Sequence, residues 1–316
     1  MIKYFDFVLS NKKLFSGIAI ILILCYHLLC TDESVSLYWI FYAGFIGVDI
    51  FMYFSGYTLC YSFEKNTITR FYWRRLKRIA PLFIVLALSI STLYVIRGSH
   101  LTVFDWFCNV TTLSYYQLGG QFIDWYLSSL FLFYLLFPLF FKIVDRIGWG
   151  GQIIVSIVIC TILSIFDIPW YYGAALARVP MFMTGIQFFV MQKRNKKEDV
   201  NKVLWFIIPL ALSITLYVLG TPIGGYMITD MFTPFLLLGL AWVIVCLNDR
   251  RTRFLGLFEI LGKYSLEIYI SNVIVMMIVK TWVHGSLNIF LAYMTLSLLM
   301  AFLILQLNKQ ITKVIK

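Results

Sequence analysis

Long apolar runs separated by short polar connections make up almost the whole chain of 316 residues. A transmembrane helix needs about 20 predominantly apolar residues, with a range of roughly 17 to 25. Runs of that length predict an all-α, polytopic membrane protein with about ten transmembrane helices in one bundle, forming a single domain over residues 1–316. The predicted spans are 14–30, 37–62, 79–96, 122–142, 151–167, 174–191, 203–220, 229–247, 257–282 and 287–307.

Lysine and arginine gather in alternate connections between these runs. Of the 26 Lys and Arg residues, 22 lie in the six stretches 1–13, 63–78, 142–150, 192–202, 248–256 and 308–316. Basic residues concentrate in the cytoplasmic loops of membrane proteins. The distribution therefore predicts a multi-pass protein of the plasma or inner membrane with both termini in the cytoplasm. The longest outer segment, 97–122, is then expected to be an interfacial or re-entrant cover.

The composition excludes a water-soluble domain. Hydrophobic residues make up 61% of the chain, charged residues 13%, and the mean hydropathy is +0.86, which a soluble domain of this size could not bury. The net charge of +11 follows from the basic loops and indicates contact with membrane lipids, with no nucleic-acid partner.

The six cysteines are scattered without a C-x-x-C pair, so we expect neither a disulfide nor a metal site. The N-terminal residues lack the features of a removed signal peptide, so we expect the first apolar run to be retained as a membrane helix.

His27 lies inside an apolar run, whereas His100 and His284 lie in short polar connections. An ionisable residue within a membrane segment marks a functional site by default. Lys13 precedes His27 by about 21 Å of helix, which places the imidazole in the outer half of the bilayer. Neutral imidazole is a general base near pH 7, so His27 is the candidate catalytic residue. The alternative is a histidine that only hydrogen-bonds a neighbouring helix.

Asp49 is a second ionisable residue within a predicted span, in the stretch GFIGVDIFMYFSGY. A buried carboxylate must be paired or protonated. An acidic neighbour would also orient His27 and stabilise its imidazolium. We therefore assign Asp49 as the catalytic companion of His27, and the alternative is pairing with a lysine or with backbone donors.

The stretch FYWRRLKRIAP is interpreted as a loop at the cytoplasmic start of the third span, and it contains Arg74, Arg75 and Arg78. Arg74 and Arg78 are separated by one helical turn, so they share a face. Two guanidinium groups in that arrangement can clamp phosphates. The alternative is a basic patch that binds anionic lipids.

Two further groups are candidates for substrate binding. Arg178 lies in the outer half of the sixth span. An arginine in lipid costs roughly 2.5 to 3.5 kcal/mol, so we expect it to face a carboxylate, a polar cavity or a substrate. Asp124, Trp125, Ser128 and Tyr134 give the fourth span a polar and aromatic stripe near its outer end. The alternative for the two aromatic residues is anchoring at the membrane interface or core packing.

Five motifs, in this order, resemble the acyltransferase-3 family of membrane proteins, which includes O-acetyltransferases of bacterial surface polysaccharides. The motifs are GIAIILILCYHLL, GFIGVDIFMYFSGY, RRLKRIAP, WYLSSLFLFYLLFP and LGKYSLEIYISN, and together they extend over nearly the whole chain. The resemblance implies transfer of an acyl group, usually acetyl, from cytoplasmic acyl-CoA to a hydroxyl of a cell-envelope polysaccharide or lipid-linked glycan. Acetyl-CoA is then a donor substrate, and no cofactor is bound permanently.

The resemblance also implies roles for particular residues. His27 would be the catalytic position, Asp49 its acidic companion, and Arg75 with Arg78 part of the donor site. Because the arginines are predicted inside and His27 in the outer half of the membrane, we expect the pantetheine arm of CoA to pass between the first three helices. The glycines expected to leave room for it are Gly17, Gly44, Gly47 and Gly56. The last three are also expected to let another helix approach closely.

Three positions depart from the family pattern. The arginine usually found eleven residues before the histidine is Ser16, the glutamate of the fourth-helix motif is Leu130, and the late histidine is Asn272. These departures leave a catalytically inactive family member as one alternative. The polar positions within the spans leave a transporter of glycolipids or polysaccharide as another.

Overall fold

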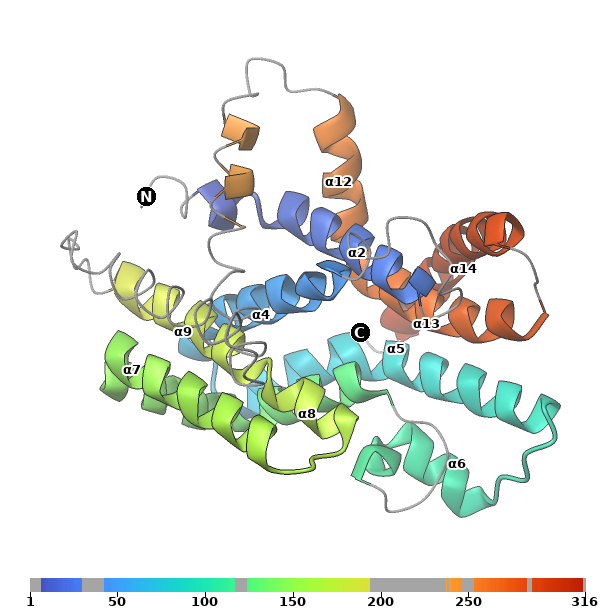
Figure 1. Ribbon diagram of the computed structural model, residues 1–316, viewed down its shortest axis with the longest axis horizontal. Helices are drawn as coiled ribbons and strands as arrows, with labels where there is room; N and C mark the ends of the chain where they lie inside the picture. Colours follow the sequence, from blue (N-terminus) through green and yellow to red (C-terminus); the bar gives the residue numbers. More distant parts are fainter. Residues whose placement is uncertain are drawn as a thin grey trace. The chain divides into compact units, whose positions relative to one another are not determined.

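The computed structural model describes residues 7–29, 43–116, 124–193, 253–282 and 286–314, with short pieces between 237 and 245. Every regular element within these residues is an α-helix or a 3-10 helix, and they include no strand (Figure 1). The predicted all-α class is therefore confirmed. The span predicted at 203–220 lies outside the described residues, and the span predicted at 229–247 is described only in part.

The first helices follow the predicted spans. α2 covers Lys12–Leu29, and α4 covers Ile46–Glu64 after the 3-10 turn η1 (Ala43–Phe45). α5 covers Ile68–Ile96, so the arginine-rich stretch is helical and its interpretation as a loop is wrong. The physical reason is that this stretch is amphipathic: it buries apolar side chains such as Phe71 and exposes Arg74 and Arg78, which extends the helix beyond the apolar span.

α7 (Trp125–Ile165) contains two of the predicted spans. Its backbone leaves the helical conformation at Gly148, with φ 59° and ψ −162°, inside the predicted connection 142–150. Glycine adopts this conformation without the strain that a side chain would add. α8 (Trp170–Leu176) and α9 (Val179–Lys193) follow and correspond to the predicted sixth span.

The span predicted at 257–282 is not one straight helix. α12 (Arg253–Lys263) and α13 (Ser265–Trp282) are related by a bend of 76°. The bend follows Gly262 and precedes Ser265, and both residue types form helices less readily than the apolar residues around them. α14 (Ser286–Val314) covers the last predicted span.

The described helices have the length and apolar character of a membrane protein. Three segments could cross a bilayer within the described residues, namely Ile68–Ile96, Trp125–Gly148 and Trp170–Lys193. The bent pair α12 and α13 is a fourth candidate. The count of ten spans stays a prediction.

The segment predicted to lie on the outer side contains two short elements, α6 (Val103–Val110) and η2 (Leu113–Tyr116). α6 exposes Phe104 and Phe107 while it buries Asn109. An amphipathic helix with exposed aromatic side chains is typical of a membrane interface. This supports the interfacial interpretation of the outer segment.

The chain is divided into two compact units that are interleaved along the sequence. Unit 1 contains Met1–Phe15, Val48–Ile68 and Phe133–Gly256, and unit 2 contains Ser16–Gly47, Thr69–Leu132 and Leu257–Lys316. Most of α4 and all of α9 therefore belong to unit 1, whereas most of α2 and all of α13 and α14 belong to unit 2. The single domain over residues 1–316 stays a prediction.

In unit 1, α4 and α9 pack backbone against backbone (Figure 1). A Cβ atom on Gly56 of α4 would meet the carbonyl of Phe182, and a Cβ atom on Gly185 of α9 would meet the carbonyl of Tyr53. Small residues on both helices permit this close approach, as is common between membrane helices.

Two ion pairs among the described residues of unit 1 show that α4 and α9 run parallel. Asp49 pairs with Arg178 just before the start of α9, and Glu64 pairs with Lys193 at its end, so the contacts follow the same order along both helices. The sequence predicts this direction, because the second and sixth spans are both expected to run from the outer side to the cytoplasm.

The glycines expected to leave room for the pantetheine arm are occupied by helix packing. A Cβ atom would meet a main-chain carbonyl at each of them: that of Phe258 at Gly17, Leu22 at Gly44, Ala19 at Gly47 and Phe182 at Gly56. Backbone atoms of neighbouring segments therefore fill the space beside these glycines. The expectation of an open passage along them is wrong, because the missing side chains are used for close helix contact.

Candidate functional site

His27 lies in the last turn of α2 and is half-buried within unit 2. Its Nδ1 is hydrogen-bonded to Oδ1 of Asn272 on α13. Nδ2 of Asn272 donates to the hydroxyl of Tyr293 on α14. That hydroxyl in turn donates to the main-chain carbonyl of Leu24, 3.2 Å away. Because Leu24 belongs to α2, the hydrogen-bonded chain begins and ends on the helix that carries the histidine.

A second buried cluster lies beside the imidazole in the same unit. The ring of Tyr269 on α13 is 6.1 Å from the ring of His27 and 4.9 Å from that of Tyr126. The Tyr269 hydroxyl donates to Oδ1 of Asp124 at 3.3 Å. The same oxygen accepts the main-chain N–H groups of Tyr126 and Leu127, so Asp124 caps the start of α7. Asp124 Oδ2 is buried and has no hydrogen-bond partner among the described residues.

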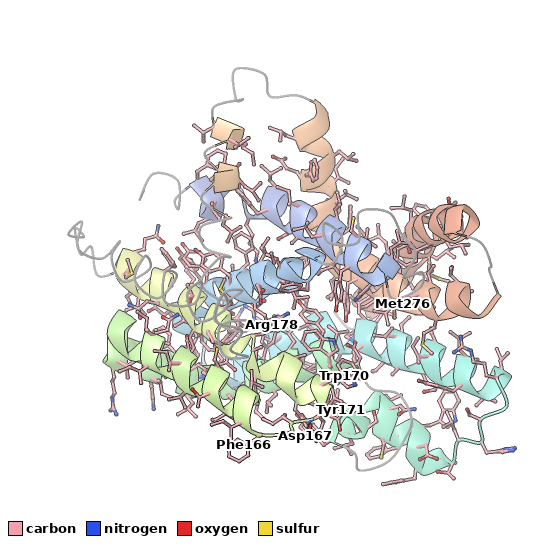
Figure 2. All side chains as sticks on the ribbon, in the orientation of Figure 1. Phe166, Asp167, Trp170, Tyr171, Arg178 and Met276 are labelled. Carbon is pink, nitrogen blue, oxygen red and sulfur yellow. The ribbon has the colours of Figure 1, made fainter. Side chains whose placement is uncertain are left out.

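Asp49 and Arg178 form a buried ion pair in unit 1. Oδ1 of Asp49 lies 2.9 Å from Nε of Arg178, which is labelled in Figure 2 at the start of α9. The carboxylate is fully buried and the guanidinium side chain is 11% exposed. The expectation that Arg178 faces a carboxylate is therefore confirmed. The described side-chain hydrogen bond of His27 is the one between its Nδ1 and Asn272. The orientation of His27 by Asp49 therefore stays a prediction.

The other predicted substrate-binding residues lie along α7. Trp125 and Ser128 are one turn apart in unit 2. Ser128 is buried, while Trp125 is partly exposed with its ring 6.0 Å from that of Tyr126. Tyr134 belongs to unit 1 and is partly exposed. Contact of these three residues with a substrate stays a prediction.

The three candidate donor-site arginines share the first half of α5. Arg74 and Arg78 are exposed and one turn apart. Arg75 is half-buried, with its guanidinium 5.8 Å from the ring centre of Phe71. This distance is within the range of a cation–π contact. α5 therefore exposes Arg74 and Arg78, whereas Arg75 packs against a side chain of the same helix.

Tyr269, Asn272 and Tyr293 are not among the predicted site residues, and Asp124 is predicted only as part of the polar stripe of the fourth span. Asn272 enters the sequence prediction only as a departure from the late histidine of the family. It lies three residues after Tyr269, which places both side chains on one helix face. Asp124 carries a weaker signal, because it is a carboxylate at the boundary of an apolar run. Tyr293 carries no signal at all, since the chain has 20 tyrosines.

Comparisons with known proteins identify the family. The sequence model of the acyltransferase-3 family, described as an acyltransferase domain, matches residues 14–306. The acyltransferase MdmB of Streptomyces mycarofaciens is 31% identical over 138 residues, which cover 37% of this chain and 35% of MdmB. The chain thus aligns with about a third of the length of that relative. No solved structure matches.

The family match includes both ends of the hydrogen-bonded chain. The matched range begins before His27 and continues beyond Tyr293. It also contains the ion pair between Asp49 and Arg178 and the arginines of α5. Because one family model covers nearly all of the sequence, the chain belongs to the acyltransferase-3 family.

Proposed function

We propose that this protein is a membrane O-acyltransferase that moves an acetyl group from cytoplasmic acetyl-CoA to a hydroxyl of a cell-envelope polysaccharide or lipid-linked glycan. The family supports acyl transfer by a membrane protein. The observation that carries the proposal is the half-buried imidazole of His27, anchored through one ring nitrogen to buried groups on α13 and α14. An imidazole held in this way is suited to act as a general base.

In the proposed reaction His27 accepts the proton of the acceptor hydroxyl as the oxygen attacks the thioester carbonyl. The new C–O ester bond forms and the C–S bond breaks. The imidazolium then returns the proton to the departing CoA sulfur, so the free thiol is released. Asp49 stabilises the imidazolium or holds Arg178, and Arg178 binds the acceptor or the developing oxyanion. Trp125, Ser128 and Tyr134 are assigned to acceptor binding.

The donor is assigned to the arginines of α5, and the membrane orientation is the one that the basic loops predict. Both termini are cytoplasmic in a plasma or inner membrane. The 3′-phosphate and diphosphate of CoA are then available to Arg74, Arg75 and Arg78. Guanidinium groups bind phosphate oxygens through paired hydrogen bonds.

Replacing both Arg75 and Arg78 with glutamine should raise the apparent KM for acetyl-CoA about 10²-fold or more while changing kcat less. The reason is the loss of two charge-assisted contacts, each worth about 1.5 to 3 kcal/mol. Lysine at the same positions should rescue only part of the loss, because an ammonium lacks the guanidinium fork. The measurement is donor kinetics in proteoliposomes.

Arg146→Gln is the matched control for the donor site, since Arg146 is an exposed arginine of α7 in another predicted cytoplasmic stretch. Its KM should not change. An unchanged KM in the Arg75 and Arg78 double variant would assign these arginines to lipid binding instead.

The function itself is tested by following the acyl group. Membranes containing the protein receive radiolabelled acetyl-CoA, and the label is counted in base-labile esters of surface glycans and of glycolipids. Label above that of membranes without the protein supports the proposal. Equal label in both, together with protein-dependent movement of unmodified glycolipid, would favour a transporter.

A further inference from the structure

We infer that Asn272 and Tyr293 are positioning residues that keep the proton of neutral His27 on Nδ1, so that Nε2 is the atom that receives the proton of the acceptor. The catalytic consequence rests on the proposed function. The position of the proton rests only on the hydrogen-bonded chain from Leu24 to His27.

The main-chain carbonyl of Leu24 gives this chain its direction. A carbonyl oxygen can only accept, so Tyr293 must use its single hydroxyl proton for the 3.2 Å bond to Leu24. The hydroxyl oxygen is then the acceptor for its other partner, Asn272. The side of the amide that faces Tyr293 must therefore be the NH2 group.

The remaining side of the amide determines the state of the histidine. With Nδ2 committed to Tyr293, Asn272 presents Oδ1 to Nδ1 of His27. An amide oxygen cannot donate, so Nδ1 must carry the hydrogen. A neutral imidazole has one N–H group, which leaves Nε2 with an unshared pair. The tautomer of a histidine is set in this way by the bond that its other nitrogen makes.

Burial makes alternative arrangements costly. Asn272 and Tyr293 are both fully buried. Reversing the amide would place Oδ1 against a hydroxyl that has no second proton to give and NH2 against Nδ1. Tyr293 would then have to turn its proton from Leu24 to Oδ1, and the buried hydrogen bond lost in this way is worth about 0.5 to 1.5 kcal/mol.

α2 carries both ends of the hydrogen-bonded chain and so fixes the distance between them. Leu24 and His27 are three residues apart on α2, which corresponds to about 4.5 Å of rise. The chain leaves α2, passes through α14 and α13, and returns less than one turn away. Asparagine suits this place because a single short side chain offers a donor to one partner and an acceptor to the other. Asn272, which replaces the late histidine of the family, therefore still has a defined role in orienting His27.

The tautomer can be measured without any assay of activity. The protein labelled with 15N-histidine contains three histidines, so the signals of His27 are identified as those missing from His27→Asn. We expect the wild-type spectrum to show Nδ1 protonated and Nε2 unprotonated. Asn272→Leu should populate the other tautomer, whereas Asn272→Asp should keep the wild-type form because a carboxylate oxygen still accepts from Nδ1.

Kinetics then test the catalytic consequence. Asn272→Leu should lower kcat by about 10²- to 10⁴-fold, the range of general-base catalysis, with little change in either KM. Asn272→Asp should recover most of this loss. Asn109→Leu is the matched control, because it removes another buried asparagine, which donates to Ser91 at 2.9 Å, without touching His27. It should change neither the His27 spectrum nor kcat.

The outcomes separate this inference from the proposed function. A wild-type spectrum with Nε2 protonated overturns the inference even if acyl transfer occurs, and so does an Asn272→Leu spectrum identical to the wild type. The expected spectra without acyl transfer would overturn the proposed function and leave the tautomer assignment supported. If Asn272→Leu fails to fold, the wild-type and Asn272→Asp spectra still decide.

Discussion

Replacing His27 with asparagine should abolish acyl transfer while the protein still accumulates in the membrane. The side-chain NH2 group of asparagine can take the place of Nδ1–H as donor to Asn272, so the buried chain to Tyr293 keeps its partners. An amide has no basic nitrogen, so it cannot accept the proton of an acceptor hydroxyl. Loss of a general base lowers the rate by about 10²- to 10⁴-fold, which would place the variant at or near background.

The measurement is the transfer of radiolabelled acetyl per molecule of folded protein. His27→Ala should be equally inactive and also less stable, because it leaves Asn272 without its partner. His100→Ala is the control, since His100 is exposed in the connection between α5 and α6. Transfer at the wild-type rate by His27→Asn would show that the imidazole is structural and that another group is the base.

The helical class and most helix bounds could be predicted because they depend on local apolar runs. α2 and α9 end within two residues of the predicted spans, and α7 breaks at Gly148 inside a predicted connection. The bend between α12 and α13 could not be predicted in this way. Both halves of that run are apolar, so average hydropathy does not distinguish a bent pair from one straight helix.

The ionisable residues of the candidate site could be predicted from the sequence, but the partner of His27 could not. A lone ionisable side chain in an apolar run is conspicuous, and this identifies His27 and Asp49 from sequence. The pairing between such groups depends on which helices meet, and that is a property of tertiary packing. The described partner of His27 is the neutral amide of Asn272, which is easier to bury than a carboxylate.

The small-residue motif likewise predicts a local property, close approach, but not the group that approaches. The glycines of GFIGVDIFMYFSGY indicate a close approach, and the structure contains it. The motif does not say whether the approaching group is a substrate or a helix. Backbone carbonyls occupy these positions, so any route for the donor must lie elsewhere.

Replacing Arg178 with glutamine should lower the free energy of unfolding by about 3 to 5 kcal/mol. The variant would leave the fully buried carboxylate of Asp49 without its cation, and uncompensated buried charges carry penalties of this size. Adding Asp49→Asn to the same chain should restore much of the stability, because no charge then remains. The measurement is unfolding of the purified protein in mixed micelles, compared across the two single variants and the double variant.

The second ion pair between α4 and α9 is the matched control. Glu64 and Lys193 join the same two helices, but the Lys193 side chain is 60% exposed. Lys193→Gln should therefore change the free energy of unfolding by only about 0 to 1 kcal/mol. Equal losses from the two pairs, or a double variant no more stable than Arg178→Gln, would contradict the buried pairing of Asp49 with Arg178.

The same variants decide between the two roles of Asp49. If Asp49 acts only by holding Arg178, then Asp49→Asn should lower kcat no further once Arg178 is glutamine. If Asp49 also stabilises the imidazolium of His27, then the double variant should lose a further factor of about ten or more in kcat, because the charge itself is then required. Transfer rates of the four proteins, normalised to folded protein, measure this coupling. Two single variants with wild-type kcat would remove both residues from the catalytic assignment and leave the pair as a link between α4 and α9.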